Sequence, residues 1–217
     1  MVDQVKAKIS MTTFLDFTLL PDGQKVRKVK EIKSKPYSWP GDYWGPLRGR
    51  LKKTLREGAD LTSLSELLNA VDEKKQANYR HAINGICKFA KKHKLQYFDA
   101  HSGVHVQDDF AIRVNPELGL IIDGVPHLIK LYFKEATTSA EIQLNKSRAS
   151  TIGHLMEKAL LPDCSDQFTK MSILNVAKGT LSTPTVRNPL DQDIALEASI
   201  AHFMRIWNRL EREEAHS

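Results

Sequence analysis

Residues 119–134 read GLIIDGVPHLIKLYFK, and this stretch decides the fold of the chain. Two apolar segments flank Asp123-Gly124, the dipeptide that readily supplies both positive-φ positions of a type I′ turn. The sequence therefore predicts a β-hairpin centred on this turn.

Further strands and helices are expected on both sides of the hairpin. Adjacent strands joined by short turns pair antiparallel, and a strand reached through a helix can join by a right-handed crossover. These patterns predict an α/β (α+β) protein with a mixed sheet, a central β-hairpin and flanking helices. Strands are predicted at 97–98, 104–106, 110–114 and 171–177, and helices at 47–56, within 60–93, at 137–161 and at 189–213.

The chain is expected to divide at its aromatic, breaker-rich segment. Residues 1–46 are interpreted as an N-terminal arm, with a short hairpin or irregular structure around Pro21-Asp22-Gly23. The arm ends in the aromatic Pro/Gly-rich segment 37–46, which is expected to pack on the body. Residues 47–217 are interpreted as a single α/β domain.

Composition narrows the class of protein. The 217 residues are 41% hydrophobic and 27% charged, as in ordinary globular proteins, with a formal net charge of +6. No apolar run approaches the roughly 18 residues of a membrane helix, and no signal peptide is visible. The two cysteines, Cys87 and Cys164, do not suggest a disulfide framework. We therefore expect a cytoplasmic protein with no membrane contact.

The order of helix, three strands, helix and strand over about residues 60–180 resembles the core of the PD-(D/E)XK nuclease-like fold. The resemblance implies a restriction-endonuclease-like topology. In that family an acid on the second strand and a Glu-x-Lys on the third bind a divalent metal and activate water. Separately, residues 114–120 (VNPELGL) and 129–134 (IKLYFK) resemble a family of uncharacterised bacterial proteins, which implies a bacterial source but no activity.

Compared residue by residue, the nuclease motif is incomplete. Lys130 matches the family's lysine, but Leu128 stands where the preceding acid should be. Asp123 is explained by the turn, and Glu117 could donate a carboxylate from the preceding strand end. A nuclease would therefore rely on Glu117, Asp123 and Lys130 with Mg²⁺ or Mn²⁺, while a catalytically silent relative would need no cofactor.

Basic residues suggest a different activity. Strand alternation places Lys130, Tyr132 and Lys134 on one face, which Arg113 could share, and a basic face with a stacking ring suits nucleic acid. The alternative is an ordinary solvated face.

A denser cluster of basic residues occupies the short helix after Pro46, beside a basic arm between Lys25 and Lys35. The cluster consists of Arg48, Arg50, Lys52, Lys53 and Arg56.

Other chemistry has less support. His101 and His105, near Asp99, Asp108 and Asp109, lack the spacing of a known metal site, so no metal is expected. Dinucleotide, Walker A and nucleophile-elbow motifs are absent from the sequence. The C-terminal helix carries one apolar stripe, which can pack on the sheet or contact a protein partner or second copy through Trp207.

Three functions remain open from the sequence. The working hypothesis is a non-catalytic accessory protein that binds nucleic acid or another polyanion. The first alternative is a metal-dependent PD-(D/E)XK-like nuclease. The second is a protein-interaction scaffold without an anionic ligand, which would show a large exposed apolar patch.

Overall fold

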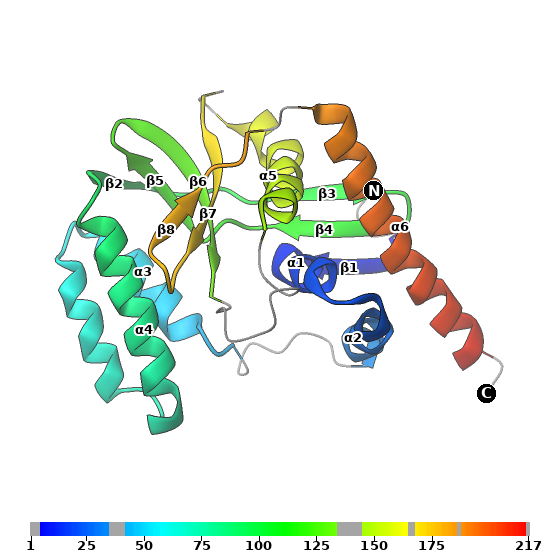
Figure 1. The fold of residues 1–217 in the computed structure, drawn as a ribbon, viewed down its shortest axis with the longest axis horizontal. Helices are drawn as coiled ribbons and strands as arrows, with labels where there is room; N and C mark the ends of the chain where they lie inside the picture. Colours follow the sequence, from blue (N-terminus) through cyan, green and yellow to red (C-terminus); the bar gives the residue numbers. More distant parts are fainter. Residues whose placement is uncertain (1–4, 35–41, 134–144, 165–167, 186–187, 216–217) are drawn as a thin grey trace.

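The computed structural model describes residues 5–34, 42–133, 145–164, 168–185 and 188–215. Two β-sheets lie side by side with helices packed around them (Figure 1). The mixed α/β class predicted from the sequence is confirmed. None of the described helices combines the length and apolar character that a bilayer crossing requires.

The larger sheet has five strands in the order β2-β5-β6-β7-β8. Its first three strands pair antiparallel, β7 joins β6 in parallel after a helical crossover, and β8 returns antiparallel to β7. The strands are β2 (Leu95–Phe98), β5 (Leu118–Ile122), β6 (Val125–Tyr132), β7 (Lys170–Asn175) and β8 (Thr180–Ser182).

The predicted hairpin is formed by β5 and β6. Asp123 and Gly124 have φ values of 50° and 90°, so both turn positions lie in the left-handed region, as the Asp-Gly pair predicted. Ile122 faces Val125 directly across the turn. The local turn chemistry therefore sets the register of the central strand pair.

The smaller sheet was not expected from the sequence, which predicted one mixed sheet. It has the order β1-β4-β3, with β1 parallel to β4 and β3 antiparallel to it. Three residues, Asn115, Pro116 and Glu117, separate β4 from β5, and these consecutive strands pair in different sheets. The strands are β1 (Ala7–Ser10), β3 (Gly103–Gln107) and β4 (Phe110–Val114).

Most of residues 11–34 is helical, so the predicted hairpin or irregular arm was wrong. Ser10 caps α1 (Met11–Leu19) by accepting a hydrogen bond from the backbone N–H of Thr13. Pro21 precedes α2 (Asp22–Ser34), where proline and an acidic residue suit a helix start better than a hairpin turn. Both helices contribute buried side chains to the main core.

The region 60–93 is helical, as predicted, and its two helices are each capped by an aspartate. Asp60 accepts the backbone N–H of Thr62 and starts the 3₁₀ helix η3. Asp72 caps α4 in the same way. The helices of this layer are α3 (Gly45–Arg56), η3 (Leu61–Asn69) and α4 (Glu73–Ala90).

The five-stranded sheet is covered on both faces. The layer containing α3, η3 and α4 packs with Ile129 and Leu131 of β6. Leu128 and Tyr132, on the other face of β6, belong to the core shared with α1 and the remaining helices. Those helices are α5 (Lys146–Leu160), the short η5 (Leu161–Asp163) and α6 (Pro189–Glu214).

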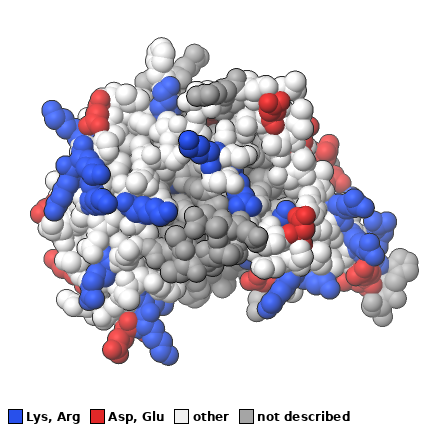
Figure 2. All heavy atoms as spheres, in the orientation of Figure 1, with Lys and Arg blue, Asp and Glu red and all other residues white. Residues whose placement is uncertain are grey.

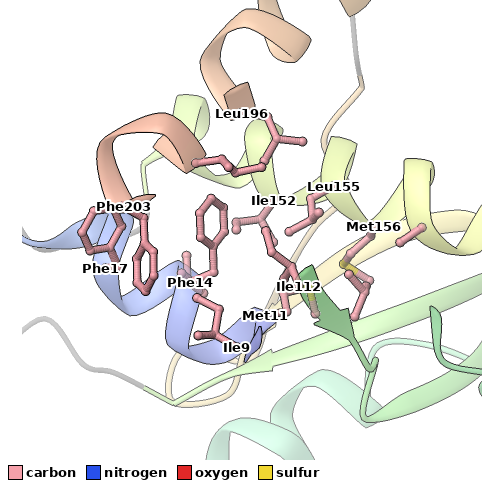
Figure 3. Packing of buried hydrophobic residues seen from close by; sticks show 14 of the residues in the cluster. Ile9, Met11, Phe14, Phe17, Ile112, Ile152, Leu155, Met156, Leu196 and Phe203 are labelled. Carbon is pink, nitrogen blue, oxygen red and sulfur yellow. The ribbon is translucent and has the colours of Figure 1, made fainter. Parts of the chain in front are cut away.

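The main core lies between the smaller sheet and helices α1, α5 and α6 (Figure 3). Phe14 and Phe17 of α1 point toward Phe203 of α6, and the rings of Phe17 and Phe203 meet edge to face at 5.1 Å. Ile112 of β4 and Ile152 of α5 close the same core. The residues of the predicted arm are therefore part of the molecule's largest apolar core.

Candidate functional site

The predicted strand face around Lys130 is not a surface. Lys130 and Tyr132 are only 3% and 7% exposed, because β6 is an interior strand with helices on both of its faces. Arg113 is exposed, but it lies on β4 in the smaller sheet. Lys134 lies outside the described residues. The structure therefore does not bring the predicted basic and aromatic face together.

Lys130 and Glu117 instead form a buried ion pair. The Lys130 ammonium donates to Oε1 of Glu117, whose side chain is 13% exposed. The other oxygen, Oε2, accepts the backbone N–H of Leu131 at 2.8 Å. This N–H lies beyond the stretch of β6 that pairs with β5, so the Glu117 carboxylate takes the place of a strand partner. Both oxygens are engaged in holding the hairpin.

Asp123 lies at the opposite end of β5 from Glu117. Its carboxylate contacts Nδ1 of His93 at 2.6 Å and accepts the backbone N–H of Lys94 at 2.8 Å. These two hydrogen bonds hold the pKa of the Asp123 carboxyl below its ordinary value. Six residues of extended chain span about 20 Å. The two carboxylates therefore cannot share a metal with Lys130, and the predicted nuclease set is not assembled.

Histidines and acids elsewhere do not assemble a metal centre in the described part of the chain, which holds no group of three or more suitable ligands. Nε2 of His101 contacts the carbonyl oxygen of Leu160 at 2.9 Å, and Asp99 is engaged by Arg56. Nε2 of His105 is buried without a hydrogen-bond partner. The residues do not fit the Mg²⁺ or Mn²⁺ of the nuclease alternative.

A second polar cluster joins α5 to α6. Nε2 of His154 lies 2.8 Å from Asp193, which also accepts from the Lys158 ammonium. Nδ1 of His154 is buried without a hydrogen bond, 3.8 Å from Glu157. Burial raises the pKa of the Glu157 carboxyl, against the opposing effect of His154. These contacts link two helices of the main core.

The basic cluster on α3 is paired with four neighbouring carboxylates, of which Asp99 contacts both Lys52 and Arg56. The structure pairs each of its five cations with a carboxylate from α3, from η3 or from the segments beside them. Exposed pairs of this kind contribute little stability, but they cancel local positive potential. The pairs are Arg48 with Asp42, Arg50 with Glu66 at 2.8 Å, Lys52 with Asp99 at 3.9 Å, Lys53 with Glu57 at 3.8 Å, and Arg56 with Asp99.

A different helix carries cations without such partners. The buried face of α4 packs on the sheet, and its opposite face carries a row of exposed Lys and Arg. At 100° per residue these positions fall within an arc of about 120°. We call this row the α4 stripe. It consists of Lys74, Arg80 and Lys88 on the helix and Lys91 and Lys92 in the turn that ends it.

Few acidic residues lie near the α4 stripe in the described part of the chain. Within the described ranges, none of its five cations forms an ion pair. Glu73 is the acidic residue of the first turn of α4. The pKa of the Asp60 carboxyl is lowered mainly by hydrogen bonds from Thr62, and to a smaller extent by the positive charge of Lys91. Figure 2 shows blue Lys and Arg side chains at the left, where α4 lies, together with red acidic side chains.

Two more exposed cations flank the α4 stripe. Lys94 follows the helix, and Lys178 lies in the turn between β7 and β8. This turn packs directly on α4 at Gly85, where an added Cβ would lie 1.9 Å from the carbonyl oxygen of Val176. The stripe is therefore carried by a helix that is firmly seated on the sheet.

The exposed row could have been found from the sequence. Tyr79, Ile83 and Ile86 repeat at helical spacing, so Lys and Arg at the intervening positions must share the outer face. What the sequence could not show is which basic cluster finds acidic partners. That depends on residues distant in the chain, such as Asp99 beside α3.

The C-terminal helix uses its apolar stripe within the molecule. Phe203 of α6 is fully buried, and Trp207 stacks on it at 6.0 Å. The indole N–H of Trp207 donates to Glu211, and Lys33 of α2 lies over the ring at 4.9 Å. The predicted packing of this helix is confirmed, while a protein partner or second copy at Trp207 stays a prediction.

Comparison of the chain with protein-family models, with curated proteins and with solved structures found no match.

Proposed function

We propose that this protein is a non-catalytic accessory protein that binds nucleic acid or a similar polyanion through the α4 stripe. The observation that carries the proposal is the contrast between two basic helices. Every Lys and Arg of the α3 cluster has an acidic partner, whereas the described residues offer no ion pair to the cations of the α4 stripe. Unpaired cations in a row attract phosphate groups and displace their counterions.

The fold supports a kinship with nucleases but not their chemistry. We infer a restriction-endonuclease-like core from the succession α4, β2, β5, β6, α5 and β7, with β3 and β4 as an insertion that joins the smaller sheet. In this interpretation β6 is the third core strand and carries Lys130. The lysine is paired with Glu117, and Leu128 occupies the acidic position of the family motif. These residues fit a nuclease-like protein that binds nucleic acid but does not cleave it.

Binding by the α4 stripe would be electrostatic and independent of sequence. Lys and Arg side chains in an exposed row can contact phosphates, while base readout needs side chains that enter a groove. His81 and Asn84, between Arg80 and Lys88, are exposed polar residues on this face. We therefore expect affinity to depend steeply on salt and weakly on base sequence.

The proposal is tested with two variants that change net charge equally. The α4 variant replaces Arg80, Lys88, Lys91 and Lys92 by Gln, and the α3 variant replaces Arg50, Lys52, Lys53 and Arg56 by Gln. Fluorescence anisotropy with labelled DNA and RNA at low salt should show binding by the native chain. The α4 variant should lose about tenfold or more in affinity, and the α3 variant should lose much less.

Both variants should keep the native circular dichroism spectrum, because all eight side chains lie at the surface. Equal losses in the two variants would indicate a diffuse charge effect and would contradict a site on α4. Absence of binding by the native chain at low salt would contradict the proposed function altogether. Metal-dependent cleavage of the labelled strands would contradict the non-catalytic assignment.

A further inference from the structure

The α4 stripe is straight and stiff. From Lys74 to Lys91 it runs about 25 Å, at a rise of 1.5 Å per residue. The helix beneath it is anchored by Tyr79, Ile86 and Phe89, all at most 3% exposed. The close contact at Gly85 fixes the helix against the turn between β7 and β8. The row of cations therefore cannot curve to follow a flexible chain.

No Phe, Tyr or Trp side chain is exposed on α4, whose one exposed ring is the imidazole of His81. The aromatic side chains of α4, Tyr79 and Phe89, are buried. Beside the start of the helix, Trp44 is stacked between Tyr79 at 5.1 Å and Phe133 at 4.5 Å. Lys75 covers the ring of Tyr43 at 5.2 Å. The Tyr and Trp rings beside the start of α4 are therefore already in contact with other rings or with Lys75.

Single strands and duplexes require different surfaces. Proteins that hold single-stranded nucleic acid combine a basic groove with aromatic rings on which bases stack, each stack contributing about 1–3 kcal/mol. A duplex hides its bases and stays straight over about 150 base pairs of persistence length. It also presents one charge per about 1.7 Å of axis, twice the density of one strand. A stiff row without an exposed Phe, Tyr or Trp suits the duplex.

We propose that the ligand of the α4 stripe is the phosphate backbone of a nucleic-acid duplex, contacted from one side without regard to base sequence. This inference rests on the proposed function and narrows its ligand. Lys178, which lies beside the middle of α4, adds a cation off the line of the row, where a second line of phosphates can reach it. DNA and RNA duplexes share this chemistry.

The test compares four probes of about 20 nucleotides or base pairs with the full chain at one moderate salt concentration. The probes are duplex DNA in two unrelated sequences, duplex RNA, and oligo-dT. We expect both DNA duplexes to bind equally and about tenfold more tightly than oligo-dT. The RNA duplex shows whether the helical form matters. The α4 variant should lose duplex affinity, and the α3 variant should retain most of it.

The outcomes separate the two proposals. Equal or tighter binding of oligo-dT would overturn the duplex inference and leave the proposed function standing. A large difference between the two DNA sequences would also overturn it, because it would require base readout. If no probe binds at low salt, both proposals fail. If duplex affinity is unchanged in the α4 variant, the duplex is bound elsewhere and both proposals fail, because each places binding on the α4 stripe.

Discussion

At the scale of single residues, burial decides what a charged side chain does. Lys130 has the type and position of a catalytic lysine in the nuclease-like interpretation, but it is 3% exposed and its ammonium donates to Glu117. Taking two charges out of water costs several kcal/mol per ion, which the pair regains only through close contact and further hydrogen bonds. The Leu131 N–H supplies one of these. The pair therefore holds the hairpin together.

This role predicts asymmetric effects of mutation. Glu117→Gln leaves the Lys130 ammonium buried without its counter-charge, which should lower the free energy of unfolding by about 3–5 kcal/mol. Glu117→Gln together with Lys130→Met removes both charges and should cost less than Glu117→Gln alone. Urea unfolding of the three proteins measures the difference. A double variant less stable than the single variant would contradict a structural ion pair.

Buried histidines predict a loss of stability on mild acidification. Burial, with a smaller effect of Lys158, lowers the pKa of His105 from its ordinary 6.5, and burial likewise lowers that of His127. Because the unfolded chain takes up protons near 6.5 and the folded chain resists them, stability should be full above that pH and fall below it. The loss should be complete once the pH is below the lowered values.

The pH effect is measured as the urea midpoint between about pH 7.5 and pH 5.5. The described Asp carboxyls with shifted pKa values all have their pKa lowered from 3.8, so they titrate outside this window. The raised pKa of Glu157 changes stability with pH in the opposite direction. His105→Gln removes one titrating group and should flatten the decline relative to the native chain. An unchanged pH dependence in that variant would show that His105 is not a source of it.

At the scale of elements, the sequence predicted individual turns and helices, but not which elements pack against each other. The Asp123-Gly124 turn and the helical spacing on α4 each depend on residues close together in the sequence, and both elements form as predicted. The exposure of β6 depends on helices from both ends of the chain, so its interior position was missed. The helices α1 and α2 were missed because Pro21-Asp22-Gly23 can start a helix as well as make a turn.

The close packing of α4 on the β7–β8 turn predicts that Gly→Ala has opposite effects on stability at two helical glycines. Gly85→Ala would place a Cβ 1.9 Å from the carbonyl oxygen of Val176, so it should destabilise the protein by about 1–3 kcal/mol despite its better helix propensity. Gly49→Ala, on exposed α3 with nothing within 4 Å of the new Cβ, should stabilise by up to about 1 kcal/mol. Thermal unfolding of both variants gives the comparison, and a stable Gly85→Ala protein would contradict the close packing.

At the scale of the whole molecule, positive charge is distributed unevenly between the two core regions. The side built on α1, α2 and α6 mixes cations and acids, as in the pairs of Lys33 with Glu211 and Glu214. The side built on α4 leaves a row of cations without ion pairs in the described ranges. Both groups of basic residues are present in the sequence, and only the folded chain distinguishes them. An exposed basic row on one rigid face is the feature that the proposed function requires.

The salt dependence of duplex binding tests this proposal most directly. Five phosphate contacts predict a slope of about −4 to −5 for the logarithm of the association constant against the logarithm of salt concentration. Replacing Lys88 and Lys91 by Gln should make the slope shallower by about 2, whereas replacing Arg50 and Lys53 should leave it nearly unchanged. A slope near zero for the native chain, or the same slope in the Lys88 and Lys91 variant, would contradict phosphate binding by the α4 stripe.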